Sequence, residues 1–169
     1  MVDALQGDGR DAEAKGVARQ WAAFLEGEAQ RAPDPTARAV FDAHRLEAYL
    51  AVGTPELAIP MLEASARDFP GDYNPPARLA RAYLGLKRYD EALAAIDRAI
   101  ALVYGPRALR LYATKADVLE ARGDRARAAA ALRDGIARVK AAPLPPRYGA
   151  TLDQLGQRAH ALEVSAATK

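Results

Sequence analysis

Two histidine–glutamate pairs are the residues of this chain whose types and spacing could do chemistry. His44 and Glu47, and again His160 and Glu163, are three positions apart, so on a helix the two side chains of each pair lie one turn apart. Such a pair could ligate a metal ion or exchange a proton. Carboxylate-bridged metal sites in helical bundles use the opposite order and need further carboxylates to converge. Solvated helix faces are therefore the favoured interpretation, with no metal ligand and no cofactor.

Motifs of the common enzyme classes are not found in the sequence. It contains no cysteine, which excludes disulfides, thiol catalysis and zinc–thiolate sites. No glycine-rich loop precedes a helix with a lysine, and no serine lies in a nucleophile elbow. Asp8 and Asp11 flank Gly9, but the calcium-loop spacing fails. We therefore expect no catalytic residue and no enzyme. A small enzyme or metal carrier stays open as a remote alternative, because sites can be assembled from positions that no motif reveals.

Composition indicates an all-α protein. Half of the 169 residues are hydrophobic but only 7% are aromatic, and 27% are charged. This mixture of Ala, Leu, Arg and Glu is rich in strong helix formers. The 24 basic and 22 acidic residues give a net charge of +2 and interleave along the chain, with no basic stripe of the kind that nucleic acid requires. Nucleic acid is therefore not an expected partner.

Membrane and export signals are also missing from the sequence. No apolar run approaches the roughly eighteen residues that would indicate a transmembrane helix. The first sixteen residues are polar and contain no apolar core of a signal peptide. We expect a cytoplasmic protein with no membrane partner, and a periplasmic location stays open if the chain is part of a longer exported protein.

The strongest signal is internal repetition. Three segments, 53–65, 87–99 and 123–135, align with a spacing of 34 and then 36 residues. Each aligned column holds one kind of residue. The small columns are Ala58, Ala92 and Ala128, and Ser65, Ala99 and Gly135; the large column between them is Leu62, Ile96 and Leu132; upstream columns are Leu46, Ala80 and Ala116, and Tyr49, Tyr83 and Leu119; Gly53, Lys87 and Gly123 fall at the turn. Two antiparallel helices can approach closely where facing residues are small, so the columns predict stacked helical hairpins.

Start and stop signals place the elements. The repeat helices are expected at 36–52, 55–69, 75–86, 89–103, 106–122 and 125–140. Asp34, Thr54 and Asn74 each precede a proline and are expected to cap a helix, and Pro60 should kink the second helix. A helix at 10–31 should pack on 36–52 through one apolar face, and a helix at 147–164 should cap the last unit. The apolar stripes of these two helices are Val17, Trp21, Phe24 and Leu25, and Tyr148, Leu152, Leu155, Ala159 and Leu162.

The period, the small columns and the segment RYDEALAAIDRAI resemble the tetratricopeptide repeat (TPR) family over about 36–140. The resemblance implies a right-handed α-solenoid of about three helical hairpins, with units at about 36–70, 71–105 and 106–142 inside a single domain at 10–169, after a flexible terminus at 1–9. Departures are Pro76 in place of a large aromatic residue and a third spacing two residues longer than expected.

The resemblance also implies the function. In this family the first helix of each unit lines a concave groove that binds peptides, so we expect a non-catalytic scaffold for a protein or peptide; self-association stays open. Transferred by register, the groove residues are His44, Glu47, Asn74, Arg78, Arg81, Arg110, Thr114, Asp117 and Glu120.

A second resemblance leads to an alternative function. The segments FPGDYNPPARLARAYL and LVYGPRALRLY are similar to the helical region that follows a thioredoxin-like domain in some bacterial proteins. It implies that the chain is the catalytically silent repeat appendage of a redox protein.

Overall fold

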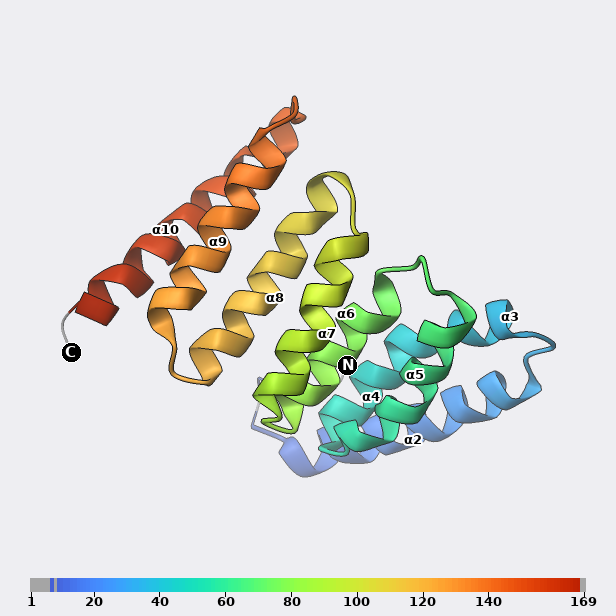
Figure 1. Ribbon diagram of the computed structural model, residues 1–169. Helices are drawn as coiled ribbons and strands as arrows, with labels where there is room; N and C mark the ends of the chain where they lie inside the picture. Colours follow the sequence, from blue (N-terminus) through green and yellow to red (C-terminus); the bar gives the residue numbers. More distant parts are fainter. Residues whose placement is uncertain (1–6, 8, 168–169) are drawn as a thin grey trace. The chain divides into compact units, whose positions relative to one another are not determined.

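A computed structural model describes residues 7 and 9–167 of the chain. Within these residues the regular structure is α-helix and short 3₁₀-helix, with no strand, which confirms the all-α prediction (Figure 1). The chain divides into two compact units, Met1–Pro70 and Gly71–Lys169. This division falls at the boundary predicted between the first and second repeat units. The predicted flexible terminus at 1–9 lies outside the described residues, except for Gly7 and Gly9.

The first unit consists of α2 (Asp11–Arg31), α3 (Pro35–Ala39), α4 (Asp42–Val52), the 3₁₀-helix η1 (Pro55–Leu57) and α5 (Ala58–Asp68). α2 packs along α4, as predicted. Of the predicted stripe only Leu25 is fully buried, and the other buried residues of α2 are alanines (Ala14, Ala18, Ala22 and Ala29). Phe24 is 62% exposed, and Val17 and Trp21 are half-buried. Close approach of two helix backbones favours small side chains at the contact, so the large ones lie beside it.

The helix predicted at 36–52 is interrupted between Ala39 and Asp42. α3 ends where the Phe41 amide bonds to the Arg38 carbonyl, and α4 begins where the Phe41 carbonyl accepts from the Arg45 amide. The break places Asp42 in the first turn of α4, where the helix dipole favours a carboxylate. Asp42 is only 1% exposed and accepts a hydrogen bond of 2.6 Å from the Ser65 hydroxyl of α5. The buried carboxylate is thereby paired, as burial of a charge requires.

Three of the predicted proline and cap positions, Pro60, Thr54 and Asn74, need correction. Pro60 does not kink a helix interior, because the segment starts as the 3₁₀-helix η1 and α5 begins only at Ala58, so Pro60 lies in the first turn, where no intrahelical bond is lost. Asp34 caps α3 as predicted, through a 2.8 Å bond from the Ala37 amide. Thr54 makes no side-chain cap, and Asn74 is itself the first residue of its helix.

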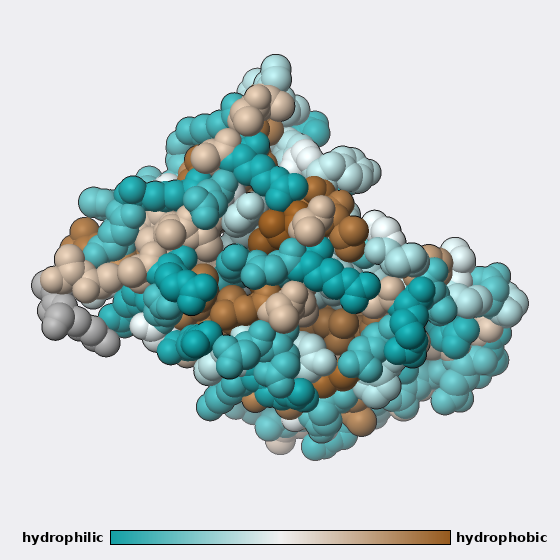
Figure 2. All heavy atoms as spheres, viewed as in Figure 1, coloured by the Kyte–Doolittle hydropathy of each residue, from teal (hydrophilic) through white to brown (hydrophobic). Residues whose placement is uncertain are grey.

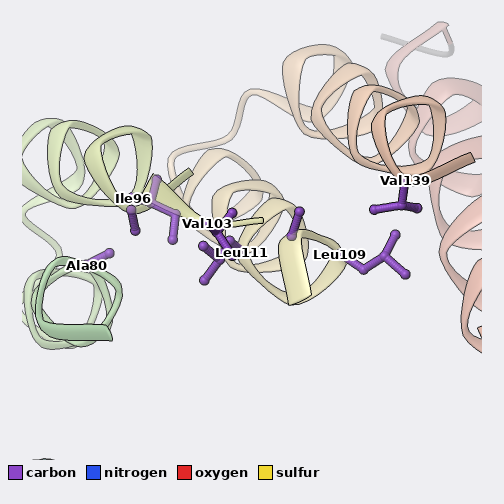
Figure 3. Packing of buried hydrophobic residues seen from close by; sticks show 8 residues of the cluster. Ala80, Ile96, Val103, Leu109, Leu111 and Val139 are labelled. Carbon is purple, nitrogen blue, oxygen red and sulfur yellow. The ribbon is translucent and has the colours of Figure 1, made fainter. Parts of the chain in front are cut away.

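The second unit consists of α6 (Asn74–Gly85), α7 (Tyr89–Leu102), η2 (Gly105–Arg107), α8 (Ala108–Ala121), α9 (Arg125–Lys140), η3 (Pro146–Tyr148) and α10 (Gly149–Ala167). α6 pairs with α7 and α8 with α9, α7 packs on α8, and α10 packs along α9 (Figure 1). The predicted columns form its core: Ala92, Ile96 and Ala99 are buried on α7, and Ala128, Leu132 and Gly135 on α9. Figure 3 shows Ile96, Val103 and Leu111 gathered in one cluster, with Leu109 and Val139 meeting between α8 and α9.

Three equivalent turns join the paired helices. Gly53, Lys87 and Gly123 have φ of +89°, +58° and +92°. A residue in the left-handed conformation therefore ends the first helix of each pair. The residue after each turn donates its amide to the carbonyl of Tyr49, Tyr83 or Leu119, which are the members of one predicted column. This bond closes the helix end as in a Schellman motif. Gly53 and Gly123 adopt the conformation without steric strain, whereas Lys87 adopts it with a side chain.

Hydrophilic residues dominate the face shown in Figure 2, and hydrophobic residues lie between them in patches. No helix in the described part of the chain is long and apolar enough to cross a membrane.

Candidate binding site on the first helices

The residues predicted to bind a partner lie on the first helices of the units. α4 carries His44 and Glu47 in the first unit. In the second unit, α6 carries Asn74, Arg78 and Arg81, and α8 carries Arg110, Thr114, Asp117 and Glu120. α6 and α8 are in contact, so their arginines lie on neighbouring helices. Arg78 is half-buried, while Arg81 and Arg110 are exposed.

The acidic residues of α8 are bound by the last helix. Arg158 of α10 forms ion pairs of 2.6 Å with Asp117 and 2.8 Å with Glu120. Partial burial works against the charge of Arg158, but the hydrogen bonds and charges of the two carboxylates outweigh it and raise the pKa of the guanidinium further. The apolar stripe predicted for this helix does not include Arg158, and nothing in the sequence pattern pairs it with α8. Asp117 and Glu120 therefore connect α8 to α10 through Arg158, and their carboxylates already have a cationic partner within the protein.

Two other predicted residues serve the local backbone. The Asn74 amide and side-chain Nδ2 both donate to the Asp72 carboxylate, at 2.9 and 2.8 Å, which fixes the entry into α6. The Thr114 hydroxyl donates to the Arg110 carbonyl one turn earlier, at 3.1 Å. These contacts occupy polar groups that the register had assigned to a partner.

An open hollow of about 450 Å³ lies at the N-terminal ends of α8 and α10, next to the start of α6. We call it the Tyr73 hollow; its lining is Tyr73, Pro106, Arg107, Leu109, Arg110, Ala113, Tyr148, Thr151 and Leu155. Tyr73, Tyr148 and Leu155 are partly buried against the core cluster that contains Leu109. These side chains make the wall of the hollow largely apolar. Among the predicted site residues, the hollow includes Arg110.

Most of this lining was missed by sequence reasoning, although a signal was present. A tyrosine stands within two residues of a proline or glycine at the start of three helices in the second unit: Tyr73 before Asn74-Pro75, Tyr104 before Gly105-Pro106, and Tyr148 between Arg147 and Gly149. The recurrence marks the same end of three helices. Nothing in the local pattern shows that Tyr73 and Tyr148 line one cavity, because they are far apart in the sequence.

The histidine–glutamate pairs are not among the residues that line the Tyr73 hollow. The His44 ring lies 6.0 Å from that of Trp21, centroid to centroid, and the helix of His44 belongs to the first unit. Glu163 forms an ion pair with Arg133, and His160 is exposed. Among the described residues there is no group of three or more His, Asp or Glu placed to hold a metal ion.

The first unit has a polar site of its own. The Tyr49 hydroxyl donates to the Glu26 carboxylate and accepts from Arg45 Nη2 at 3.4 Å. Burial of the phenol, followed by its bond to Glu26, raises the pKa of Tyr49. This group borders a cavity of about 300 Å³ lined by Glu26, Ala29, Gln30, Ala32, Arg38 and Arg45.

Comparison with known proteins agrees with this architecture. Residues 49–114 match a family described as tetratricopeptide repeat, which agrees with the resemblance seen in the sequence. No curated protein sequence matches the chain significantly.

Solved structures of similar fold are repeat proteins as well. Two structures of a Podosopora anserina protein, described as a kinesin light chain with nearly identical TPR-like repeats, match with TM-scores of 0.58 and 0.57 at 18% and 20% identity. They cover 99% and 98% of this chain and 93% and 92% of that protein. The crystal structure of MamA matches with a TM-score of 0.51 at 17% identity, covering 100% of this chain and 98% of that one. At such identities the likeness concerns the fold alone. None of these matches bears on the thioredoxin-associated resemblance, which stays a prediction.

Proposed function

We propose that the chain is a non-catalytic scaffold that binds a protein or peptide on the side of its first helices. Tetratricopeptide repeats are typically protein-interaction scaffolds, and the fold provides a rigid helical framework for such a surface. One observation carries the proposal for this chain. The first helix α8 and the last helix α10 line an open hollow together with Tyr73, which precedes α6; the hollow has an apolar wall and arginines at its edge.

The physical basis is an apolar surface that lies close to arginines without an ion-pair partner among the described residues. Binding energy concentrates where apolar and aromatic anchors are desolvated next to arginine, whose planar fork holds carboxylates or carbonyls. Arg78 and Arg110 supply such groups on adjacent helices, and no described carboxylate forms an ion pair with either. The acids Asp117 and Glu120 both form ion pairs with Arg158.

The test is capture of partners from the native host by the full chain, followed by mass spectrometry and measurement of affinity for the captured protein. Arg78→Glu with Arg81→Glu should weaken that affinity by about tenfold or more, which is about 1.4 kcal/mol. Folding stability should change by less than about 1 kcal/mol, since helix-surface positions tolerate such substitutions.

Arg98→Glu with Lys140→Glu is the matched control. It makes the same change of charge at exposed positions of α7 and α9, the second helices of their units. Equal losses in the two variants would indicate general electrostatic attraction. An unchanged affinity in the α6 variant would place the binding surface elsewhere.

A further inference from the structure

The Tyr73 hollow has the dimensions and wall of a side-chain pocket. Its volume of about 450 Å³ lies within the range of small-ligand pockets and exceeds what one large side chain needs. Leu109 at its wall is buried, and Ala113, Leu155 and the two tyrosines add apolar surface around it. Half-buried tyrosines contribute large rigid contact areas to recognition at a small cost in conformational entropy. An apolar or aromatic side chain is the group that this wall fits.

The edge of the hollow is positively charged. Arg107 and Arg110 both line it, both are exposed, and no carboxylate among the described residues forms an ion pair with either. Arg107 lies over the Tyr104 ring, 5.8 Å from its centroid, which leaves its guanidinium edge available to an acceptor. The first turns of α8 and α10 contain no acidic residue to offset the positive ends of these helices. Asp72, two residues before α6, accepts hydrogen bonds from Asn74.

We infer that the Tyr73 hollow binds a peptide segment in which an acidic residue stands beside a large apolar side chain. The apolar side chain enters between Tyr73, Leu109 and Tyr148, and the neighbouring carboxylate is held by Arg107 and Arg110. Guanidinium groups pair with carboxylates through two parallel hydrogen bonds, so the pair of arginines selects for the acid as the wall selects for the apolar group. This inference rests on the proposed function and adds the class of partner to it.

The experiment is a selection from a displayed library of random short peptides on the immobilised full chain. Enriched sequences should carry Asp or Glu within one or two positions of Leu, Ile, Phe, Tyr or Trp. A synthetic peptide of the most enriched sequence is then titrated against variants by fluorescence anisotropy. Arg107→Glu with Arg110→Glu should weaken it about tenfold or more, while Arg98→Glu with Lys140→Glu should change it by less than about twofold. Thr151→Phe, at an exposed lining position, should also weaken it, because a ring there reduces the space for the peptide side chain.

The outcomes separate this inference from the proposed function. Enrichment of peptides without an acid–apolar pair, with affinity that depends on Arg78 and Arg81 but not on Arg107 and Arg110, would overturn the inference and leave the scaffold proposal intact. A peptide that binds equally well to the Arg107/Arg110 variant would also overturn it. Failure to enrich any peptide would contradict both. Circular dichroism of each variant verifies that it remains folded.

Discussion

Gly135 lies on α9 at the closest approach of α9 to α8. A methyl group added there would stand 2.6 Å from Cβ and 2.7 Å from Cγ of Tyr112. The Tyr112 Cβ is attached directly to the backbone of α8, so it cannot move aside without shifting the helix. The small residue in this repeat column is therefore required by packing between helices.

Gly135→Ala should destabilise the protein although alanine is the better helix former. Helix propensity favours the substitution by about 0.5–1 kcal/mol, but overpacking costs about 1–3 kcal/mol, so a net loss of about 1 kcal/mol is expected. Urea denaturation measures it. Gly156→Ala on α10 is the control: nothing lies within 4 Å of the added methyl, so stability should rise. If Gly135→Ala and Gly156→Ala both stabilise the protein, then α8 and α9 are not in close contact at Gly135.

Tyr49 gives the first unit a pH dependence on the alkaline side. The pKa of its phenol in the folded protein is raised above the ordinary value for tyrosine, chiefly by burial and then by the hydrogen bond to Glu26. Because the pKa is higher in the folded protein than in the unfolded chain, the neutral Tyr49 phenol stabilises the folded state. This contribution to the free energy of unfolding is fully present below about pH 10 and is lost as the pH rises through the pKa of the folded protein.

Tyr49→Phe should lower stability by about 1–2 kcal/mol near pH 8, because the hydrogen bond to Glu26 is lost. The difference in the free energy of unfolding between the wild-type protein and the variant should then narrow as the pH rises above about 10. Above that pH this tyrosine ionises in the unfolded wild-type chain, which stabilises the unfolded state. Urea denaturation at a series of pH values measures the gap. Tyr104→Phe, at a 71% exposed position, should give no comparable trend. A gap that stays constant or widens with pH would contradict the assignment.

At the scale of elements, α10 covers the exposed side of α9. Ala159 and Leu162 pack against α8 and α9 residues that include Ala128 and Leu132, and Arg158 ties α10 to α8. The apolar stripe predicted for α10 thus packs against the core, and the neighbouring Arg158 adds an ion pair to α8. A repeat array needs such a terminal helix, because its last hairpin would otherwise expose an apolar face.

Removing residues 147–169 should therefore cause self-association or a loss of cooperative unfolding. Light scattering after size exclusion and a thermal melt measure the two effects. In the full chain, Leu162→Asp should destabilise by about 2 kcal/mol or more through burial of a charge, whereas His160→Asp, on the exposed side, should change little. A truncated protein that stays monomeric and melts at the parent temperature would show that α10 is not a cap.

At the scale of the whole molecule, the unit Gly71–Lys169 has the hydrophobic core and the interhelical ion pairs expected of a segment that folds independently. Its two core clusters draw their buried residues from α6 to α10 and the connections between them. Its ion pairs between helices, such as that of Lys115 with Asp97 at 2.7 Å, join α7 to α8 and α8 to α10. Both core clusters and these ion pairs lie within residues 71–169.

A fragment of residues 71–169 should accordingly fold alone. Far-UV circular dichroism should show the helical content of this segment, and urea should unfold it in one transition with an m value of about 1 kcal/mol/M or more. A fragment that melts without a cooperative transition would show that residues 1–70 are required for the fold. In that case the single domain predicted at 10–169 would be the better description.

The sequence by itself determined the helical class, the repeat and the packing columns. A period of 34 to 36 residues and the small residues Ala92 and Ala128 are local patterns, and close helix packing leaves few other ways to bury them. The turns followed for the same reason, because Gly53 and Gly123 suit the left-handed conformation that ends a helix.

The interruption of the helix predicted at 36–52 depended on tertiary contact. Buried Asp42 forms its bond with Ser65 from the adjacent helix, and no period in α4 encodes that bond. The buried face of α2 was decided in the same way. Trp21 and Phe24 form a plausible apolar stripe, but the close approach of α4 selected the alanines.

The candidate site was determined least by the sequence. Register transferred from the repeat selected Arg110, which lines the hollow, and also Asp117 and Glu120, which form ion pairs with Arg158 that the register did not indicate. Tyr73 and Tyr148 line one cavity although two helical hairpins separate them in the chain. Periodicity specifies which face of each helix is buried. Only the stacking of the helices decides which exposed groups meet, because those distances depend on how all the intervening hairpins pack.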